Sequence, residues 1–113
     1  MKMNVLDKGD VVVIELKGKI MGGPDATILN DRLHELIDEN KNKVVVDLGG
    51  VNWMNSSGLG ILIGGLTTMR NNKGDLKLAR VTERIENLLM ITKLITVFET
   101  FESVEDAIKS FSN

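Results

Sequence analysis

The sequence predicts an α/β fold, with a mostly parallel or mixed sheet of four or five strands and about four helices in the order β-β-α-β-α-β-α-β-α. Short runs rich in valine and isoleucine alternate with longer segments whose apolar residues recur at helical spacing. The first two runs are separated only by Asp7-Lys8-Gly9-Asp10, which is typical of a hairpin turn in which Gly9 takes a positive φ. Whole helices separate the later strands, which can therefore lie parallel.

The first half of the chain is expected to contain two strands, a connector, a helix and a central strand. Their ranges are a strand at 3–6, a strand at 11–16, a connector at 18–24, a helix from 25 to about 40–42, a strand at 43–48 and a loop at 49–54. Pro24 suits the first turn of the helix. The helix carries its apolar residues at helical spacing: Ile28, Leu29, Leu33, Leu36 and Ile37.

The second half is expected to contain three helices and two strands. Their ranges are a helix at 56–72, a strand at 75–79, a helix after 82, a strand at 95–98 and a final helix after 103. Thr82 caps the middle helix, whose apolar residues are Ile85, Leu88, Leu89 and, at its end, Ile91. Ser103, followed three residues later by Asp106, resembles a capping box with a shorter acid.

Composition excludes several classes of function. The 113 residues fit one domain, expected to span 1–113. Basic and acidic residues nearly balance, 14 against 16, and no basic block appears, which argues against nucleic acid as a partner. There is no cysteine for a disulfide or a thiol nucleophile. The start of the chain lacks the apolar run of a signal peptide, and no run is long enough for a membrane span, so a soluble, cytoplasmic protein is expected.

The segment Asn55-Ser56-Ser57-Gly58-Leu59-Gly60 carries the most functional information. It follows a strand-like run and opens an apolar helical pattern, so two adjacent hydroxyls lie at a helix N-terminus. Such a position has unpaired N–H groups and a partial positive charge, which suit either a serine cap or a phosphate. From the residues alone, both interpretations of Ser56 and Ser57 stay open.

The helix that follows this segment has two distinct faces. Leu59, Leu62, Ile63, Leu66 and Met69 form an ordinary core face. Beside it lies a small, uncharged set that we call the neutral stripe: Ser56, Gly60, Gly64, Thr67 and Asn71. Glycine within a helix costs about 1 kcal/mol relative to alanine, and close approach of another backbone is the usual reason to accept that cost for Gly60, Gly64 and Gly65. The approaching backbone belongs either to this chain or to another protein.

No pattern in the sequence points to enzyme chemistry or to a cofactor. Gly58, Gly60 and Gly64 have a spacing one residue too long for a dinucleotide loop, and the Gly-Lys-Ser/Thr of a P-loop is absent. His34 is the only histidine and is expected at the surface, so a transition-metal site is not expected. Caps and turns account for Asp25, Asp47 and Asp75, Trp53 is expected to be partly buried, and Met69 and Met90 are expected in the core.

The segment around Ser56 resembles the signature of the STAS domain, and within it the bacterial anti-sigma factor antagonists. That signature is an apolar strand, here Val44-Val45-Val46-Asp47-Leu48, a short loop, and Asp-Ser-(Ser/Thr)-Gly-(Leu/Ile)-Gly opening a helix. The segments Gly18-Lys19-Ile20, Gly74-Asp75-Leu76-Lys77-Leu78 and Phe101 to Ala107 resemble other family segments in the same order. The family aspartate is Asn55 here, which keeps the capping ability but lacks the negative charge.

The resemblance implies a partner-switching mechanism. It implies that the unmodified protein binds an anti-sigma factor that is also a serine kinase and so frees a sigma factor. It implies that this kinase phosphorylates Ser56, that the complex then dissociates, and that a separate phosphatase restores the protein. The partner-binding surface is expected at Met21, Gly22, Asn55, Ser57, Gly58, Gly60, Gly64, Thr67 and Asn71, and a homodimer is an alternative use of the exposed face.

The sequence leaves two other functions open. One is a STAS-type scaffold or a subunit of a stress-sensing or transport complex, without a serine switch. The other is a small phosphotransfer or nucleotide-handling enzyme, which the sequence disfavours because it offers no nucleophile with an adjacent base and no metal cluster.

Overall fold

The computed structural model describes residues 1–112. Its five strands and four helices follow the predicted order, which confirms the α/β fold class. They are β1 (Lys2–Lys8), β2 (Val11–Ile20), α1 (Pro24–Asp38), β3 (Lys43–Met54), α2 (Ser56–Asn71), β4 (Asp75–Ala79), α3 (Glu83–Ile91), β5 (Thr100–Phe101) and α4 (Val104–Ser110).

One mixed sheet runs through the molecule in the order β1-β2-β3-β4-β5. β1 and β2 form the antiparallel hairpin, and the other neighbouring strands are parallel. In the hairpin turn Gly9 has φ 82° and its N–H donates to the Asp7 carboxylate at 3.0 Å. An ion pair between Asp7 and Lys41 connects this turn to the segment between α1 and β3.

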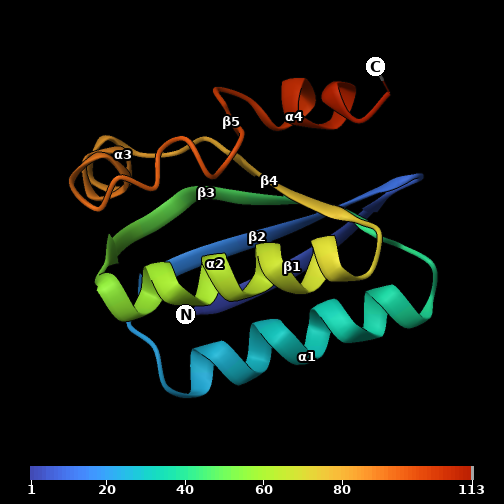
Figure 1. The fold of residues 1–113 in the computed structure, drawn as a ribbon, viewed down its shortest axis with the longest axis horizontal. Coiled ribbons are helices and arrows are strands. Elements are labelled where there is room, and N and C mark those ends of the chain that lie inside the picture. The colour runs from blue at the N-terminus through green and yellow to red at the C-terminus, as the bar shows by residue number, and fades with distance from the viewer. Residues whose placement is uncertain (113) are drawn as a thin grey trace.

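The two faces of the sheet are covered by different helices (Figure 1). Val12, Ile14 and Leu16 of β2 point into the larger core beneath α1, α2 and α3. The alternate residues Val11 and Val13 point to the opposite face, where Ala107 of α4 completes a smaller core. Because successive strand residues point to opposite faces, the apolar run of β2 supplies both cores.

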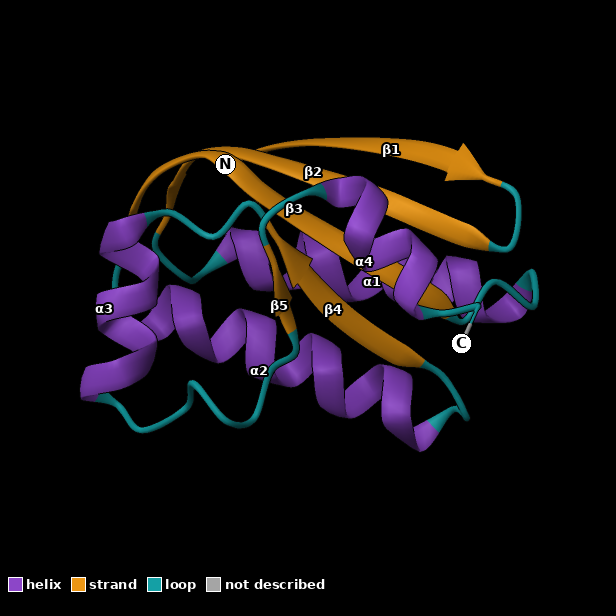
Figure 2. Ribbon diagram, turned by 90° about the horizontal axis from the view of Figure 1, so that it is seen from above, coloured by secondary structure: helices purple, strands orange, loops and turns teal. Residues whose placement is uncertain are grey.

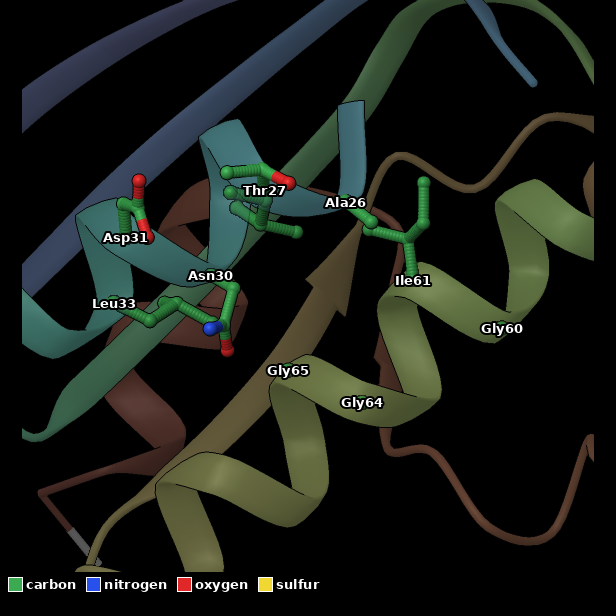
Figure 3. A pocket seen from close by; sticks show the side chains of 10 residues that line it. Ala26, Thr27, Asn30, Asp31, Leu33, Gly60, Ile61, Gly64 and Gly65 are labelled. Atoms are coloured by element: carbon green, nitrogen blue, oxygen red, sulfur yellow. The ribbon is translucent and has the colours of Figure 1, made fainter. Parts of the chain in front are cut away.

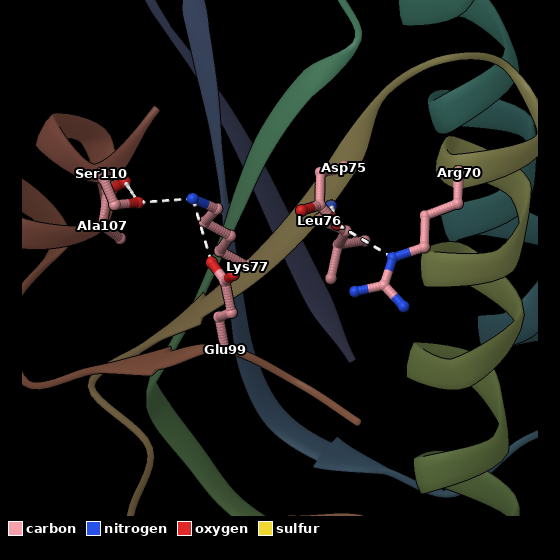
Figure 4. Close-up of polar contacts among 7 residues, drawn as sticks. All are labelled: Arg70, Asp75, Leu76, Lys77, Glu99, Ala107 and Ser110. Atoms are coloured by element: carbon pink, nitrogen blue, oxygen red, sulfur yellow. Dashed lines mark hydrogen bonds and ion pairs between the residues drawn. The ribbon is translucent and has the colours of Figure 1, made fainter. Parts of the chain in front are cut away.

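A buried lysine helps to fix α4 against the sheet (Figure 4). Lys77 of β4 is 7% exposed. Its Nζ donates to Ser110 Oγ at 2.7 Å, lies 3.0 Å from a Glu99 carboxylate oxygen and stands 4.3 Å from the centre of the Phe111 ring. These contacts satisfy an ammonium group that would be costly to bury unpaired.

Three helices end in the same way. After α1, α2 and α3 the chain takes a positive φ, 61° at Asn40, 64° at Lys73 and 63° at Lys93. The next amide then bonds back to a carbonyl five residues earlier: Lys41 to Leu36, Gly74 to Met69 and Leu94 to Leu89, each at 2.8 Å. This is the Schellman ending, which usually has glycine at the left-handed position.

Three sequence predictions about strands are wrong. β2 continues to Ile20, and residues 49–54, expected as a loop, belong to β3 because they pair with the second half of β2. Residues 95–98 do not form a strand, and β5 lies later, at Thr100–Phe101. Ile95 and Phe98 instead pack on the core, so their apolar character reflects burial without strand pairing.

Several predicted core positions also differ. Met90 is 57% exposed and Ile91 79% exposed, because the inward face of α3 consists of Ile85 and Leu89 with the partly buried Leu88. Ile28 of α1 is also exposed. Met69 is fully buried, as expected. Ile61, absent from the predicted core face of α2, is buried beside α1, and Ile63, predicted there, is only partly buried.

Candidate functional site

The N-cap of α2 is Asn55, not either serine. The Asn55 side-chain oxygen accepts a hydrogen bond from the N–H of Gly58 at 2.7 Å, and its backbone is extended. Ser56 and Ser57 are the first two residues of the helix, and both are exposed. The interpretation of Ser56 or Ser57 as the cap is therefore wrong, because the residue before them already satisfies the third N–H of the helix.

Asn55 also connects α2 to the end of β2. Since its oxygen faces the Gly58 N–H, its amide nitrogen must point the other way, where it donates to the carbonyl of Met21 at 3.4 Å. Its backbone N–H donates to the carbonyl of Ile20, also at 3.4 Å. One asparagine thus contacts both the helix and the loop that leaves β2.

Two glycines allow this loop to lie directly against the helix. A Cβ on Gly58 would overlap the carbonyl oxygen of Ile20, and a Cβ on Gly22 would lie 2.9 Å from the Cβ of Ser57. Gly22 also has φ 98°, a conformation that side chains disfavour. The structure therefore brings Met21, which is 52% exposed, and Gly22 to the same rim as the start of α2.

The neutral stripe faces solvent along its whole length. Ser56, Gly60, Gly64, Thr67 and Asn71 are all exposed. Apart from the helix's own backbone, a Cβ placed on Gly60 or Gly64 meets no atom of residues 1–112 within 4 Å, so no neighbouring element of the described structure requires glycine there. Among the glycines of α2, close internal packing explains Gly58 and Gly65. A Cβ on Gly65 would lie 3.1 Å from Leu33 Cδ1.

A groove runs between α1 and α2 beside the neutral stripe (Figure 3). Its volume is about 310 Å³. Gly60 and Gly64 form part of the α2 wall, and the Asn30 side chain of α1 extends into the space between the helices. Ile61, Gly65 and Leu33 form the buried apolar side of the groove. The missing side chains of Gly60 and Gly64 keep the groove open toward the stripe.

The start of α2 is electrostatically positive. Its first turn contains no acidic residue. Asn55 takes up the N–H of Gly58, while the N–H groups of Ser56 and Ser57 have no partner within the helix. The aligned peptide dipoles add a partial positive charge at this end. A negative group on the Ser56 oxygen would therefore be favourable in the free protein.

The remaining sequence candidates take structural roles. Asp25 accepts from the Met21 N–H at 3.5 Å, Asp75 pairs with Arg70 at 3.3 Å, and Asp47 accepts from Gly49 and Arg80. His34 is exposed and Trp53 is partly buried. Within residues 1–112, no group of three histidine, cysteine or acidic side chains is placed to hold a metal ion. None of the four helices combines the length and the apolar character that a membrane crossing requires.

Comparisons with known proteins identify the family. The family model for the STAS domain matches residues 2–107. An anti-sigma-B factor antagonist of Staphylococcus epidermidis is 34% identical over 77 residues, 68% of this chain and 71% of that protein. A crystal structure of an anti-sigma factor antagonist from Mycobacterium paratuberculosis superposes with a TM-score of 0.83, at 20% identity, over 99% of this chain and 94% of that one.

A second solved structure shares the fold. The Bacillus cell fate determinant SpoIIAA, in its phosphorylated form, superposes with a TM-score of 0.75, at 16% identity, over 97% of this chain and 99% of its own. The match of the family model over nearly all of the chain, together with the staphylococcal relative, places this protein in the STAS domain family, among the anti-sigma factor antagonists.

Proposed function

We propose that the protein binds an anti-sigma factor with serine kinase activity and so releases a sigma factor in the cytoplasm, and that phosphorylation of Ser56 ends this binding. The observation that carries the proposal is the exposure of Ser56 at the positive end of α2, where it begins the neutral stripe. The staphylococcal relative is an antagonist of an anti-sigma-B factor, and SpoIIAA has a phosphorylated form. Both support the proposal by analogy.

The neutral stripe suits close contact with another polypeptide. Gly60 and Gly64 leave backbone atoms accessible, and no charged side chain on the stripe must be desolvated. The groove beside the stripe can receive a side chain of the partner, with the Asn30 amide available for a hydrogen bond. Met21 and Gly22 extend the same surface at its rim because Asn55 and Ser57 contact their loop.

Phosphorylation would act locally under this proposal. A phosphate adds about −1.5 to −2 charges and three strong acceptors. The free helix N-terminus tolerates this group, whereas a tightly packed interface would bury it without partners at a cost of several kcal/mol. The difference between the two environments favours dissociation without any change of fold.

The test requires the partner kinase, which can be recovered by pull-down with unmodified protein and then purified. The purified kinase and ATP should add one phosphate to the chain and none to Ser56→Ala, as read by intact mass. Ser57→Ala, which changes the neighbouring hydroxyl, is the matched control and should be modified like wild type. Ser56→Asp should bind the kinase at least about tenfold more weakly than wild type. Equal binding of Ser56→Asp and wild type would contradict the switch.

One observation favours a second function. Asn55 is neutral where the family resemblance implies an aspartate, so the carboxylate expected next to Ser56 is replaced by an amide that cannot accept a proton. A STAS scaffold that binds its partner through the same stripe without a serine switch would fit this change. Tight binding to the recovered partner together with no phosphate on Ser56 would support the scaffold. Self-association through the exposed stripe is measured separately, by the concentration dependence of the sedimentation coefficient.

A further inference from the structure

The sheet face beneath α4 is covered over only part of its length. α4 packs against β3, β4 and β5 and shields Val11, Val13 and Val45. Figure 2 shows α4 over one half of β2 and β3, and no helix over their carboxyl-terminal halves on this side. Part of this sheet face is thus left to solvent.

Basic side chains gather on the uncovered half. Leu16 and Ile20 of β2 lie in the core on the other side of the sheet, so Lys17 and Lys19 point outward here. Lys2 of β1 lies directly opposite Lys17 in the register, and Arg80, which follows β4, lies against the neighbouring strand β3. We call Lys2, Lys17, Lys19 and Arg80 the basic face, and all four residues are exposed.

Two irregularities in β3 lie along this face. The pairing of β2 with β3 shifts between Glu15 and Lys17 and again between Gly18 and Lys19, and β3 has one more residue than β2 at each shift. Such bulges change the direction of side chains and increase the local twist. They bring Gly49 and Gly50 beneath the basic side chains, and they place Trp53 beside Lys19.

The two glycines hold basic side chains against the sheet. A Cβ on Gly50 would lie 2.8 Å from Lys17 Cγ, so the aliphatic part of Lys17 lies across this residue. A Cβ on Gly49 would overlap the Arg80 guanidinium. Arg80 is anchored by its Nε, which donates to the buried Asp47 carboxylate at 2.8 Å. The basic side chains are therefore partly ordered before any partner arrives.

This arrangement is unfavourable for the isolated protein. Like charges directly opposite each other on neighbouring strands are destabilising, as Lys2 and Lys17 are here. Arg80 has φ 53°, a left-handed conformation that costs energy for any side chain with a Cβ. No ion pair within residues 1–112 includes Lys2, Lys17 or Lys19, and Glu15, on the same face, accepts instead from Asn4 at 3.1 Å. A like-charge pair and a strained backbone that lie close together on one face are typical of a binding site.

We infer that the basic face binds an acidic segment of a partner protein. The ammonium groups of Lys2, Lys17 and Lys19, which form no ion pair within residues 1–112, complement carboxylates, and the ring of Trp53 adds an apolar contact next to Lys19. Anionic membranes are bound by clusters of about four to eight free basic residues, and here Arg80 is already paired with Asp47. The chain as a whole has a net charge of −2, which opposes adsorption to membranes and to nucleic acid, whereas a protein needs only local complementarity. This inference does not depend on Ser56 or on the neutral stripe.

The experiment titrates the isotope-labelled full chain with a deca-glutamate peptide and follows the amide signals and the Trp53 indole signal by NMR. The test variant is Lys17→Glu/Lys19→Glu. The control Lys73→Glu/Lys93→Glu changes net charge equally at exposed residues elsewhere. Thermal unfolding of both variants checks that they fold. Vesicles of phosphatidylcholine with phosphatidylserine, and a single-stranded DNA, are titrated in parallel.

We expect saturable, salt-sensitive shifts confined to β1, the second half of β2 and β3. The test variant should lower the affinity about tenfold, and the control less than about twofold. Equal losses in the two variants, or shifts spread over all lysines, would overturn the inference. Tighter binding of the vesicles or of the DNA through Lys17 and Lys19 would assign the face to those ligands instead.

Discussion

Alanine at both Gly60 and Gly64 should stabilise the isolated protein. Each glycine lies inside α2 and costs about 1 kcal/mol relative to alanine. Outside the helix's own backbone, the added methyl groups meet no described atom within 4 Å, so no steric penalty offsets the gain. The double substitution should therefore raise the free energy of unfolding by about 2 kcal/mol. For a domain of this size that corresponds to an increase in melting temperature of roughly 6–10 °C.

Urea unfolding followed by circular dichroism measures this gain, and an unchanged slope with denaturant shows that the change lies in stability. Gly58→Ala and Gly65→Ala are controls in the same helix. A Cβ at 58 would overlap a backbone oxygen, so Gly58→Ala should destabilise, while Gly65→Ala meets two side-chain methyls at 3.1 and 3.3 Å and should gain less than Gly60→Ala. If Gly60→Ala/Gly64→Ala unfolded as easily as Gly58→Ala, the reasoning would be refuted.

The same double substitution should have the opposite effect on partner binding. If the neutral stripe contacts a partner as proposed, two methyl groups placed between closely packed surfaces will weaken the complex while the protein itself becomes more stable. Isothermal titration with the recovered kinase measures the affinity. A higher free energy of unfolding together with a weaker affinity for the kinase would show that these glycines serve recognition and not folding. An unchanged affinity would show that Gly60 and Gly64 are not part of the interface.

Three further predictions concern stability and local order. Asn55→Asp keeps the cap but removes the N–H donor to the Met21 carbonyl, so the free energy of unfolding should change by less than about 1 kcal/mol. The amides near Met21 should exchange faster with deuterium, and unchanged exchange would contradict the described contact. Lys93→Gly removes a left-handed side chain and should raise the free energy of unfolding by up to about 1 kcal/mol in urea titrations, whereas a loss would contradict the described ending of α3. The hydrogen bond from Lys41 lowers the pKa of Asp7, so the contribution of this pair is present at neutral pH and is lost as the pH falls below about 4. Asp7→Asn should flatten the pH dependence of stability in that acidic range, and an unchanged profile would exclude the pair as its source.

The predictable features were those set by short stretches of sequence. The order of elements, the hairpin at Gly9, the position of the neutral stripe on α2 and the cap at Ser103 follow from periodicity and turn chemistry, whereas the sequence left open whether the stripe is exposed. The end of β3 was not predictable in this way, because Gly49, Gly50 and Asn52 favour a loop locally and only pairing with β2, far away in sequence, makes them a strand. Long-range pairing thus overrode local preference.

In the candidate site, too, some features follow from the local sequence and others only from the three-dimensional structure. Three residues in a row, Asn55, Ser56 and Ser57, are good caps, and only the geometry assigns the cap to the first. The groove between α1 and α2 depends on Asn30, which no motif singles out. The basic face brings together Lys2 and Lys17 from different strands, and its signal in the sequence was the pair of consecutive glycines at 49 and 50.

The neighbours of the two serines differ in a way that bears on enzyme selectivity. The Cβ of Ser57 borders Gly22, so a bulky group on that hydroxyl must share space with the loop, whereas Ser56 begins the open side of its helix. A modifying enzyme that needs to surround its target oxygen would reach the Ser56 hydroxyl more easily than the Ser57 hydroxyl. The surroundings of the two serines in this protein would then determine which one is modified, and the enzyme itself would need little selectivity between them.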